Sequence, residues 1–577
     1  MRYIARVATN PGAEQVRTQM SPARLPDGWS IATEEPGLFV ACDEPFAVTA
    51  FGCPGSVSLG AVYPRDPADS RAGAALLTAR DYPPEELVRA VCGDYVAFLR
   101  TGSESITTII RAPFGRLPCY YAVEDGYVLL GSDTAALRHA GLRKSAIDVD
   151  QLAKRLAFRE LPASRTCLEG VRQLNGGNIL SVGATTAQCR AVWTPWTFAG
   201  RGHWLESRYE AKEYLRNNVL HAVRLSSQGA TKRLLFLSGG LDSAILAASL
   251  GSLGGAFTCL NLHAGADSSD ERDYARAVAK RLGGHLIEAQ WAIADIDIEH
   301  ADFAARPDPV ARSFMQATSR VATNVASNIG ADCIIDGGGG DNVFGALYSV
   351  APAVDAWKFD TMAIGWNVSR TLASLAQVGV PQVLWRTAMR SLRLSRAYRW
   401  RPDTQLLSSD VAASLPATAD HPWLRPPRSA ERGTAAQVAL IAAAQSWAQE
   451  PDLATSCRHI SPLASQVMVE ACLRVPSWWW ISDGRDRAVA RDAFAPRLPL
   501  SVLTRRSKGT PDSFLAELYR HNRSRIRTML LEGRLRAFGL IDLAAIELAT
   551  APGPVVDTTY LRMLQLADVE AWLTAQG

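Results

Sequence analysis

The residues best suited to chemistry in this 577-residue chain form the run SGGLDS at positions 238–243. The apolar run 234–237 before it has the composition of a strand, and the alanine-rich stretch after it is typical of a helix. Glycines let the backbone approach an anion closely, and the amides of a loop that opens a helix point N–H groups at that anion. The segment therefore predicts a strand, a loop and a helix that bind a chain of phosphates.

A second glycine-rich run, DGGGGDNVFG at positions 336–345, follows another predicted strand. Ligands of parallel sheets bind beyond the carboxyl ends of the strands, so Asp242 and Asp341 are expected on the rim of one site. Two carboxylates that face a triphosphate suit Mg²⁺, which prefers oxygen ligands. For either aspartate alone, capping of the following helix is the alternative interpretation.

The elements that must position these two loops alternate along the chain. Strands are expected near 257–262, near His285 and at 332–336, with helices from Asp270 and over about 313–328. Such alternation predicts a doubly wound parallel sheet. Residues 1–195 instead read as β-rich, with short alternating runs between turns. We therefore expect an α/β protein with a β-rich domain over 1–195 and a second domain over 205–577, interrupted by an insertion at about 351–427.

Composition excludes several classes of protein. A formal net charge of +4 is small for this length and gives no argument for nucleic-acid binding. The ten cysteines form no C-x-x-C pair and the nine histidines form no metal-spaced cluster. The N-terminus lacks the apolar core of a signal peptide, and glycines split the charge-free run 243–262, so no membrane segment is expected. These features favour a cytoplasmic protein.

Two stretches resemble known families. SGGLDS resembles the PP-loop of ATP pyrophosphatases, which split ATP between its α and β phosphates, and no Walker sequence occurs in the chain. Residues 93–98, 111–118 and 131–133 look like the glutaminase-type domain, an Ntn-type fold, at the front of asparagine synthetases. That family uses a cysteine exposed by removal of Met1, whereas this chain has Arg2. The resemblance thus implies a degenerate domain that releases no ammonia from glutamine and serves for structure or docking.

The run 336–345 is similar to the second phosphate motif of asparagine synthetases, with two departures. Gly338 replaces the first glutamate of that motif and Asn342 replaces its last, and the tyrosine of β-lactam synthetases is also missing. In the later run RRSKG, Lys508 stands where the family has a lysine that contacts the α-phosphate and the developing oxyanion. Arg487 and Arg491 are candidates for structural ion pairs.

The resemblance implies a complete set of site residues. The catalytic residues would be Lys508, Asp242 and Asp341, and the two aspartates would hold Mg²⁺. The residues expected around ATP are Leu237, Ser238, Gly239, Gly240, Leu241, Asp242, Ser243, Asn261, Asp336, Gly337 and Gly338.

The expected activity is that of an ATP-dependent, AMP-forming ligase. DGGGGDNVF and the later run HPWL at 421–424 look like the macrolactam synthetases that close lasso peptides. That resemblance implies a precursor or core peptide whose α-amine attacks an activated Asp or Glu side chain, and it implies leader-binding and protease partner proteins. The alternatives are an asparagine synthetase or β-lactam-type enzyme acting on a small molecule, and an inactive binding or regulatory homologue.

Six arginines recur at helix-like spacing between positions 386 and 401, within the expected insertion. A solvated helix face is one interpretation of this stretch, and a docking site for an acidic peptide or partner is the other.

Overall fold

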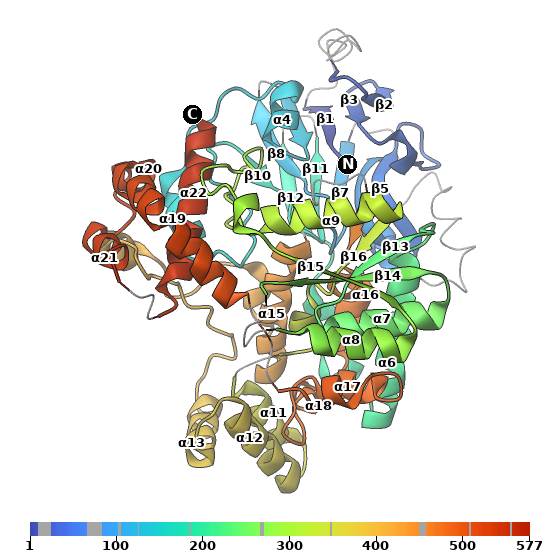
Figure 1. Cartoon of the computed structure of the whole chain (residues 1–577). Helices are drawn as coiled ribbons and strands as arrows, with labels where there is room; N and C mark the ends of the chain where they lie inside the picture. Colours follow the sequence, from blue (N-terminus) through green and yellow to red (C-terminus); the bar gives the residue numbers. More distant parts are fainter. Residues whose placement is uncertain are drawn as a thin grey trace.

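A computed structural model gives the fold of the chain (Figure 1). The structure describes residues 1–9, 25–65, 83–101, 106–124, 126–183, 186–265, 270–346, 349–448, 457–506, 509, 511–553 and 557–577. Two antiparallel sheets are built from the N-terminal third of the chain, and one parallel sheet from the rest. The expected β-rich domain and parallel α/β domain are thereby confirmed.

The N-terminal domain stacks two six-stranded sheets. The first has the order β10-β8-β9-β1-β3-β2 and the second the order β12-β11-β7-β6-β5-β4. Its strands are β1 (Tyr3–Ala8), β2 (Ser30–Glu35), β3 (Leu38–Cys42), β4 (Val48–Ala50), β5 (Val57–Pro64), β6 (Val91–Thr101), β7 (Ile106–Arg111), β8 (Tyr120–Glu124), β9 (Tyr127–Gly131), β10 (Arg172–Gln173), β11 (Asn178–Val182) and β12 (Ala187–Ala191). Helices α3 (Pro84–Ala90), α4 (Thr134–Ala140) and α5 (Val149–Ala157) accompany them.

Alternation along β1 explains how this domain packs. Tyr3, Ala5 and Val7 belong to a core between the sheets, where the Tyr3 ring meets Phe98 edge-on at 6.2 Å. Ile4, on the opposite face, belongs to the larger core that also contains residues of α4. Because side chains alternate across a strand and both faces of β1 are covered, the whole strand is buried.

The second domain is organised around a five-stranded parallel sheet of order β15-β14-β13-β16-β17. Its strands are β13 (Arg233–Phe236), β14 (Phe257–His263), β15 (His285–Gln290), β16 (Cys333–Ile335) and β17 (Arg458–Ile460). The chain runs outward from β13 to β15 and then returns to the other side of β13 as β16. The point where strand order reverses, where ligands of doubly wound sheets bind, therefore lies between β13 and β16.

Helices lie around this sheet, and further helices make up the rest of the domain. The helices around the parallel sheet are α6 (Arg208–Ser226), α7 (Leu241–Leu253), α8 (Arg272–Leu282), α9 (Met315–Ile329) and α10 (Gly340–Val343). The segment expected to be an insertion contains α11 (Ala351–Phe359), α12 (Met362–Leu375), α13 (Val380–Ser391) and α14 (Ser409–Ser414). The rest are α15 (Arg432–Ala448), α16 (Gln466–Leu473), α17 (Ala488–Phe494), α18 (Leu500–Thr504), α19 (Asp512–Glu532), α20 (Arg534–Ala537), α21 (Leu543–Ala549) and α22 (Thr559–Gln576). No helix in the described ranges is long and apolar enough to cross a membrane.

The HPWL run anchors the insertion to the N-terminal domain. The buried Trp423 ring lies 5.5 Å from that of Trp193 and 6.0 Å from that of Phe114. The indole N–H of Trp196 donates to the Trp423 carbonyl at 3.1 Å, and the Trp423 amide donates to Nδ1 of His421 at 3.2 Å. This run therefore forms an aromatic junction between domains rather than part of the ligand site.

The arginine stretch divides into two groups. Arg390 donates to the carbonyl of Ala397 at 2.9 Å, and Arg396 donates to that of Ala430 at 2.8 Å, so both stabilise the chain's own loops. Arg386 and Arg393 are exposed, which fits a solvated helix face.

Candidate active site

The loop after β13 is folded tightly against α8. Gly240 donates its amide to Oγ of Ser238 at 3.3 Å, and the hydroxyls of Ser238 and Ser243 lie 3.2 Å apart. Gly239 has a φ of +79°, and a Cβ at that position would lie 2.7 Å from Cβ of Tyr274. Only glycine fits this turn, which leads directly into α7 at Leu241. The loop and the first turn of α7 thus present backbone amides to one face, as phosphate binding requires.

Asn261 supports this loop from the neighbouring strand β14. Its side-chain amide donates to the Leu237 carbonyl at 2.8 Å, and the residue is 1% exposed. Leu237 also donates its amide to the Leu260 carbonyl at 2.8 Å, which extends the pairing of β13 and β14 to the start of the loop. Asn261 therefore fixes the start of the loop from within the sheet.

The loop after β16 approaches the first loop through its glycines. The Gly338 amide donates to Oδ1 of Asp336 at 2.7 Å, which closes the turn. A Cβ on Gly340 would lie 2.5 Å from Cγ of Asp242 and one on Gly337 3.4 Å from Cβ of Asp242, so the absence of side chains lets the two loops meet. The two runs singled out in the sequence are thereby brought together at the strand-order reversal.

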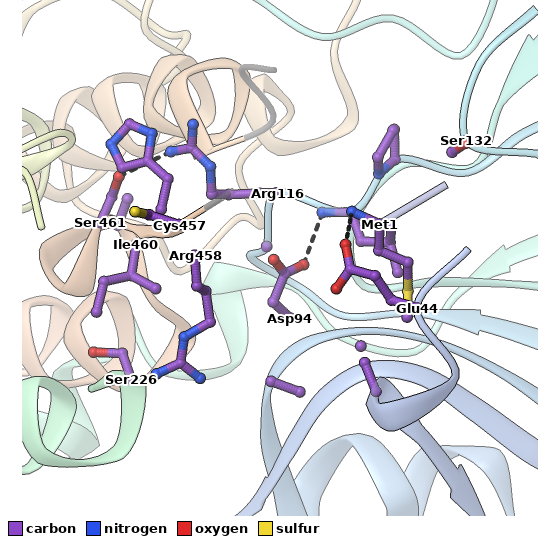
Figure 2. Close-up of a pocket in the computed structure, with 18 of the residues that line it drawn as sticks. Met1, Glu44, Asp94, Arg116, Ser132, Ser226, Cys457, Arg458, Ile460 and Ser461 are labelled. Atoms are coloured by element: carbon purple, nitrogen blue, oxygen red, sulfur yellow. Dashed lines mark hydrogen bonds and ion pairs between the residues drawn. The ribbon is translucent and has the colours of Figure 1, made fainter. Parts of the chain in front are cut away.

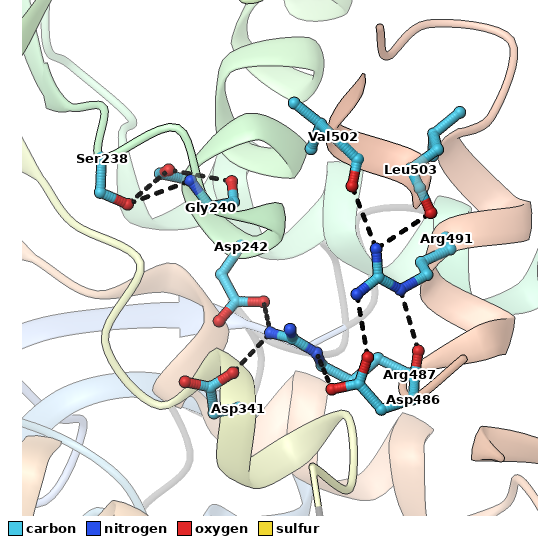
Figure 3. Close-up of polar contacts among 10 residues, drawn as sticks. Ser238, Gly240, Asp242, Asp341, Asp486, Arg487, Arg491, Val502 and Leu503 are labelled. Carbon is cyan, nitrogen blue, oxygen red and sulfur yellow. Dashed lines mark hydrogen bonds and ion pairs between the residues drawn. The ribbon is translucent and has the colours of Figure 1, made fainter. Parts of the chain in front are cut away.

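Arg487 joins the two predicted metal ligands (Figure 3). One of its terminal nitrogens lies 2.5 Å from Oδ1 of Asp341 and 3.3 Å from Oδ1 of Asp242. Burial opposes the charge of Arg487, but the carboxylates of Asp242, Asp341 and Asp486 outweigh it and raise its pKa above the ordinary value. The guanidinium therefore neutralises two carboxylates that would otherwise repel one another.

Arg487 is itself held in place by its neighbours. Asp486 accepts from Nε of Arg487 at 3.2 Å and from Arg491 at 2.9 Å. Arg491 is buried and also donates to the carbonyls of Val502 and Leu503 at 3.0 and 3.1 Å. The ion pairs expected for Arg487 and Arg491 are present, and they connect α17 and α18 to the site.

The donor set around Asp242 and Asp341 fits a nucleotide-bound Mg²⁺. Both carboxylates reach the same guanidinium nitrogen, so a cation at that place could contact both, and carboxylate oxygens are its preferred ligands. No group of three or more His, Cys, Asp or Glu side chains suited to a metal occurs in the described part of the chain. The remaining ligands of such an ion would have to come from phosphate oxygens and water.

Asp336 forms a partly buried ion pair with His459. Its Oδ2 lies 2.5 Å from Nε2 of His459, which comes from β17. Burial by itself would raise the pKa of this carboxyl, but the charge of His459 and its hydrogen bond, with help from Arg116, hold the pKa well below its usual range. Asp336 thus remains ionised and shapes the glycine loop.

The segment that carries Lys508 is fixed on both sides of that residue, although Lys508 itself lies outside the described residues. Arg505 pairs with Oε1 of Glu271 at 2.5 Å and donates to the Gly239 carbonyl at 3.4 Å. The Gly509 amide donates to the same Glu271 oxygen at 2.6 Å. The residues that flank Lys508 are therefore bound next to the first phosphate loop.

Sequence reasoning did not identify His459, Glu271 or Arg505 as parts of the site. Arg487 was expected to form an ion pair, but its position between the two aspartates was not foreseen. Each of these residues reaches the site from an element far away in the chain, and no local spacing signals that. The strand that carries His459, β17, is three residues long and too short for periodicity to reveal.

The start of the N-terminal domain presents structural contacts. Nε of Arg2 lies 3.0 Å from Oδ2 of Asp133, and the Tyr3 amide donates to Oγ of Ser132 at 3.2 Å. Asp94 accepts from the Leu117 amide at 2.7 Å. These polar groups hold strands and turns together.

Comparison with known proteins agrees with this architecture. Residues 214–574 match the asparagine synthase family, and residues 74–193 match the glutamine amidotransferase domain family. No curated protein matches the chain.

Two solved structures are among those similar to the chain, each covering 58% of it. One is the allosteric regulatory enzyme of purine biosynthesis, at 10% identity over 89% of that protein with a TM-score of 0.23. The other is glutamine phosphoribosylpyrophosphate amidotransferase from B. subtilis, at 9% identity over 90% of that protein with a TM-score of 0.22. Because the first family match spans well over half of its length, the chain belongs to the asparagine synthase family of ATP-dependent amidation ligases.

Proposed function

We propose that this protein is a macrolactam synthetase of the lasso-peptide type. It would adenylate an Asp or Glu side chain of a core peptide and join that side chain to the peptide's own α-amine. The observation that carries the proposal is the glycine loop after β16, which offers an incoming amine no catalytic base at position 338.

The surroundings of Gly338 support this choice. A Cβ at that position would lie 2.8 Å from Oδ1 of Asp336 and 3.4 Å from Oγ of Ser461. Asp336 already binds His459 and the loop backbone, and Ser461 accepts a hydrogen bond from Arg116 at 3.2 Å. An amine that belongs to the same molecule as the acceptor needs less help from a base, because holding both groups together supplies a high effective concentration.

The reaction balances in two steps. An oxygen of the substrate carboxylate attacks the α-phosphorus of ATP, a phosphoanhydride bond breaks, and pyrophosphate leaves. The amine nitrogen then attacks the carbonyl carbon, the bond from that carbon to the phosphate-bound oxygen breaks, and AMP leaves while the amine loses a proton to solvent. Both steps build negative charge on phosphate or carbonyl oxygens, which fixed donors stabilise.

The residues would divide these tasks. The backbone amides at the start of α7 would bind phosphate oxygens. Asp242 and Asp341 would hold Mg²⁺, which offsets phosphate charge when bound. Lys508 would contact the α-phosphate, as the family resemblance implies. Leader-binding and protease partner proteins would deliver the peptide.

The proposal is tested by searching beside this gene for a short precursor-peptide gene and using the peptide that it encodes. Its core peptide is incubated with the protein, the protease partner, ATP and Mg²⁺, and the product is examined by mass spectrometry. Loss of one water, with AMP and pyrophosphate formed in equal amounts, is the expected result. An unchanged peptide mass together with ATP cleavage on small carboxylates would favour the small-molecule ligase instead, and no ATP chemistry on any substrate would favour the inactive homologue.

A further inference from the structure

A large cavity separates the N-terminal domain from the parallel sheet (Figure 2). Its volume is 1810 Å³, whereas pockets for small molecules measure about 300 to 1,000 Å³. One wall comes from the N-terminal domain, including Glu44 and Asp94, and the opposite wall from the second domain, including Ser226 and Ser461. The cavity is too large for ammonia or a free amino acid to define its shape.

Ser461 stands between the cavity and the glycine loop after β16. Ser461 lines the cavity, and its Oγ would lie 3.4 Å from a Cβ on Gly338. Arg116 of the N-terminal domain donates to the same Oγ, so both domains meet at this point. The cavity therefore adjoins the glycine loop across Ser461, and a Cβ on Gly338 would already lie 2.8 Å from Oδ1 of Asp336.

The wall from the N-terminal domain includes a half-buried strand edge. Residues 60–63 of β5 line the cavity, whereas β4 pairs with β5 only over residues 57–59. In the described part of the chain, no strand pairs with the outer edge of β5 beyond Leu59. A strand edge with no partner strand is a binding surface for an extended polypeptide, which adds to the sheet through its main chain.

Two cysteines, Cys92 and Cys457, line the described walls of the cavity. Burial raises the pKa of Cys92 to about 11, so its thiol is protonated near neutral pH. The thiol of Cys457 donates to the Ala331 carbonyl at 2.9 Å.

We infer that this cavity, which adjoins the adenylation site across Ser461, binds an extended segment of the peptide substrate along the edge of β5. The inference rests on the proposed function for the identity of the ligand as a peptide. It gives the N-terminal domain a new role, as one wall of the substrate site.

Bulky substitutions in two separate walls test this inference. Ser226→Trp narrows the cavity from α6, and Ser319→Trp narrows it from α9. Ser327→Trp is the matched control, because Ser327 is an exposed serine on α9 that lies outside the cavity. The probe is the synthetic core peptide of the neighbouring precursor with a fluorophore at its C-terminus. Its binding is followed by fluorescence anisotropy without ATP, so that no chemistry is needed.

We expect both cavity variants to raise the Kd for the peptide about tenfold or more, and Ser327→Trp to change it less than about twofold. Unfolding midpoints and their shift with MgATP report whether each variant is folded. Wild-type Kd values in both cavity variants, or no peptide binding by the wild type, would overturn the inference. Weakened binding in both variants without ring closure by the wild type would uphold the inference while refuting the proposed function. Wild-type Kd values together with ring closure in both variants would refute the inference while supporting the proposed function.

Discussion

The polar residues described in the two domains make different kinds of contact. At the carboxyl edge of the parallel sheet, Asp242 and Asp341 converge on one guanidinium beside two glycine loops. In the N-terminal domain, Arg2 forms an ion pair with Asp133, and Asp94 accepts a hydrogen bond from the amide of Leu117. The two aspartates of the second domain thus face the place where a ligand would bind, whereas Arg2 and Asp94 hold strands and a turn of the N-terminal domain. The comparison indicates that chemistry resides in the second domain and that the first supplies a wall.

Among the variants that test this difference between the domains, Asp242→Asn is expected to have the largest effect on ATP chemistry. Loss of this carboxylate should lower magnesium-dependent pyrophosphate release by about 10³-fold or more, since charge stabilisation at a reacting phosphate supplies several kcal/mol. Lys508→Ala should have a similar effect. Pyrophosphate release is measured with the unfolding midpoint as a check on the fold, and turnover retained in either variant would refute the site assignment.

Arg487→Gln should reveal how the two carboxylates are balanced. Removing one member of a buried ion pair typically costs about 3 to 5 kcal/mol, so the nucleotide-free protein should be destabilised by about 3 kcal/mol. Part of that loss should return with MgATP, because a bound cation would replace the missing charge. Thermal unfolding with and without MgATP measures both effects, and the exposed Arg393→Gln is the control. An unchanged midpoint would show that Arg487 does not neutralise the pair.

The junction between the domains should respond to acid through His421. Burial lowers the pKa of His421 to about 4 from an ordinary value of 6.5, so between these values the unfolded chain binds a proton that the folded chain does not. Above the unfolded pKa, His421 is neutral in both states and costs the folded state no stability. As pH falls to about 5, the free energy of unfolding decreases by about 2 kcal/mol through this residue. Urea unfolding at about pH 5 and at a pH above 6.5 measures the difference in the free energy of unfolding between the two conditions. His421→Gln should reduce this difference, and His285→Gln, at an exposed position, should leave it unchanged. An undiminished acid response in His421→Gln would contradict the assignment.

The smallest effect is expected from Arg2→Ala in the N-terminal domain. Arg2 is half exposed in its pair with Asp133, so its loss should cost less than about 1 kcal/mol of stability. Pyrophosphate release should match the wild type. A large loss of ATP chemistry in this variant would break the division of roles between the two domains.

Sequence patterns identify much of this fold because strand and helix alternation is strong around Ser238 and Asp336. The glycines at 239 and 340 also mark the places where two backbones must approach closely. The sequence does not reveal Arg487 between the aspartates, nor the pairing of His459 with Asp336, because these contacts join elements that are over a hundred residues apart. The resemblance of the HPWL run to macrolactam synthetases does not reveal where that run lies, and the structure places its Trp423 ring at the junction of the domains.

The central claim, that a peptide carboxylate is adenylated and then captured by an amine, is tested most directly with ¹⁸O in the acceptor side chain. The account predicts that each ring closure transfers one ¹⁸O from the carboxylate to AMP, because that oxygen stays on phosphorus when the amine displaces AMP. Mass spectrometry of the nucleotide would show this as AMP heavier by one label. Unlabelled AMP, or label found in inorganic phosphate, would contradict the account.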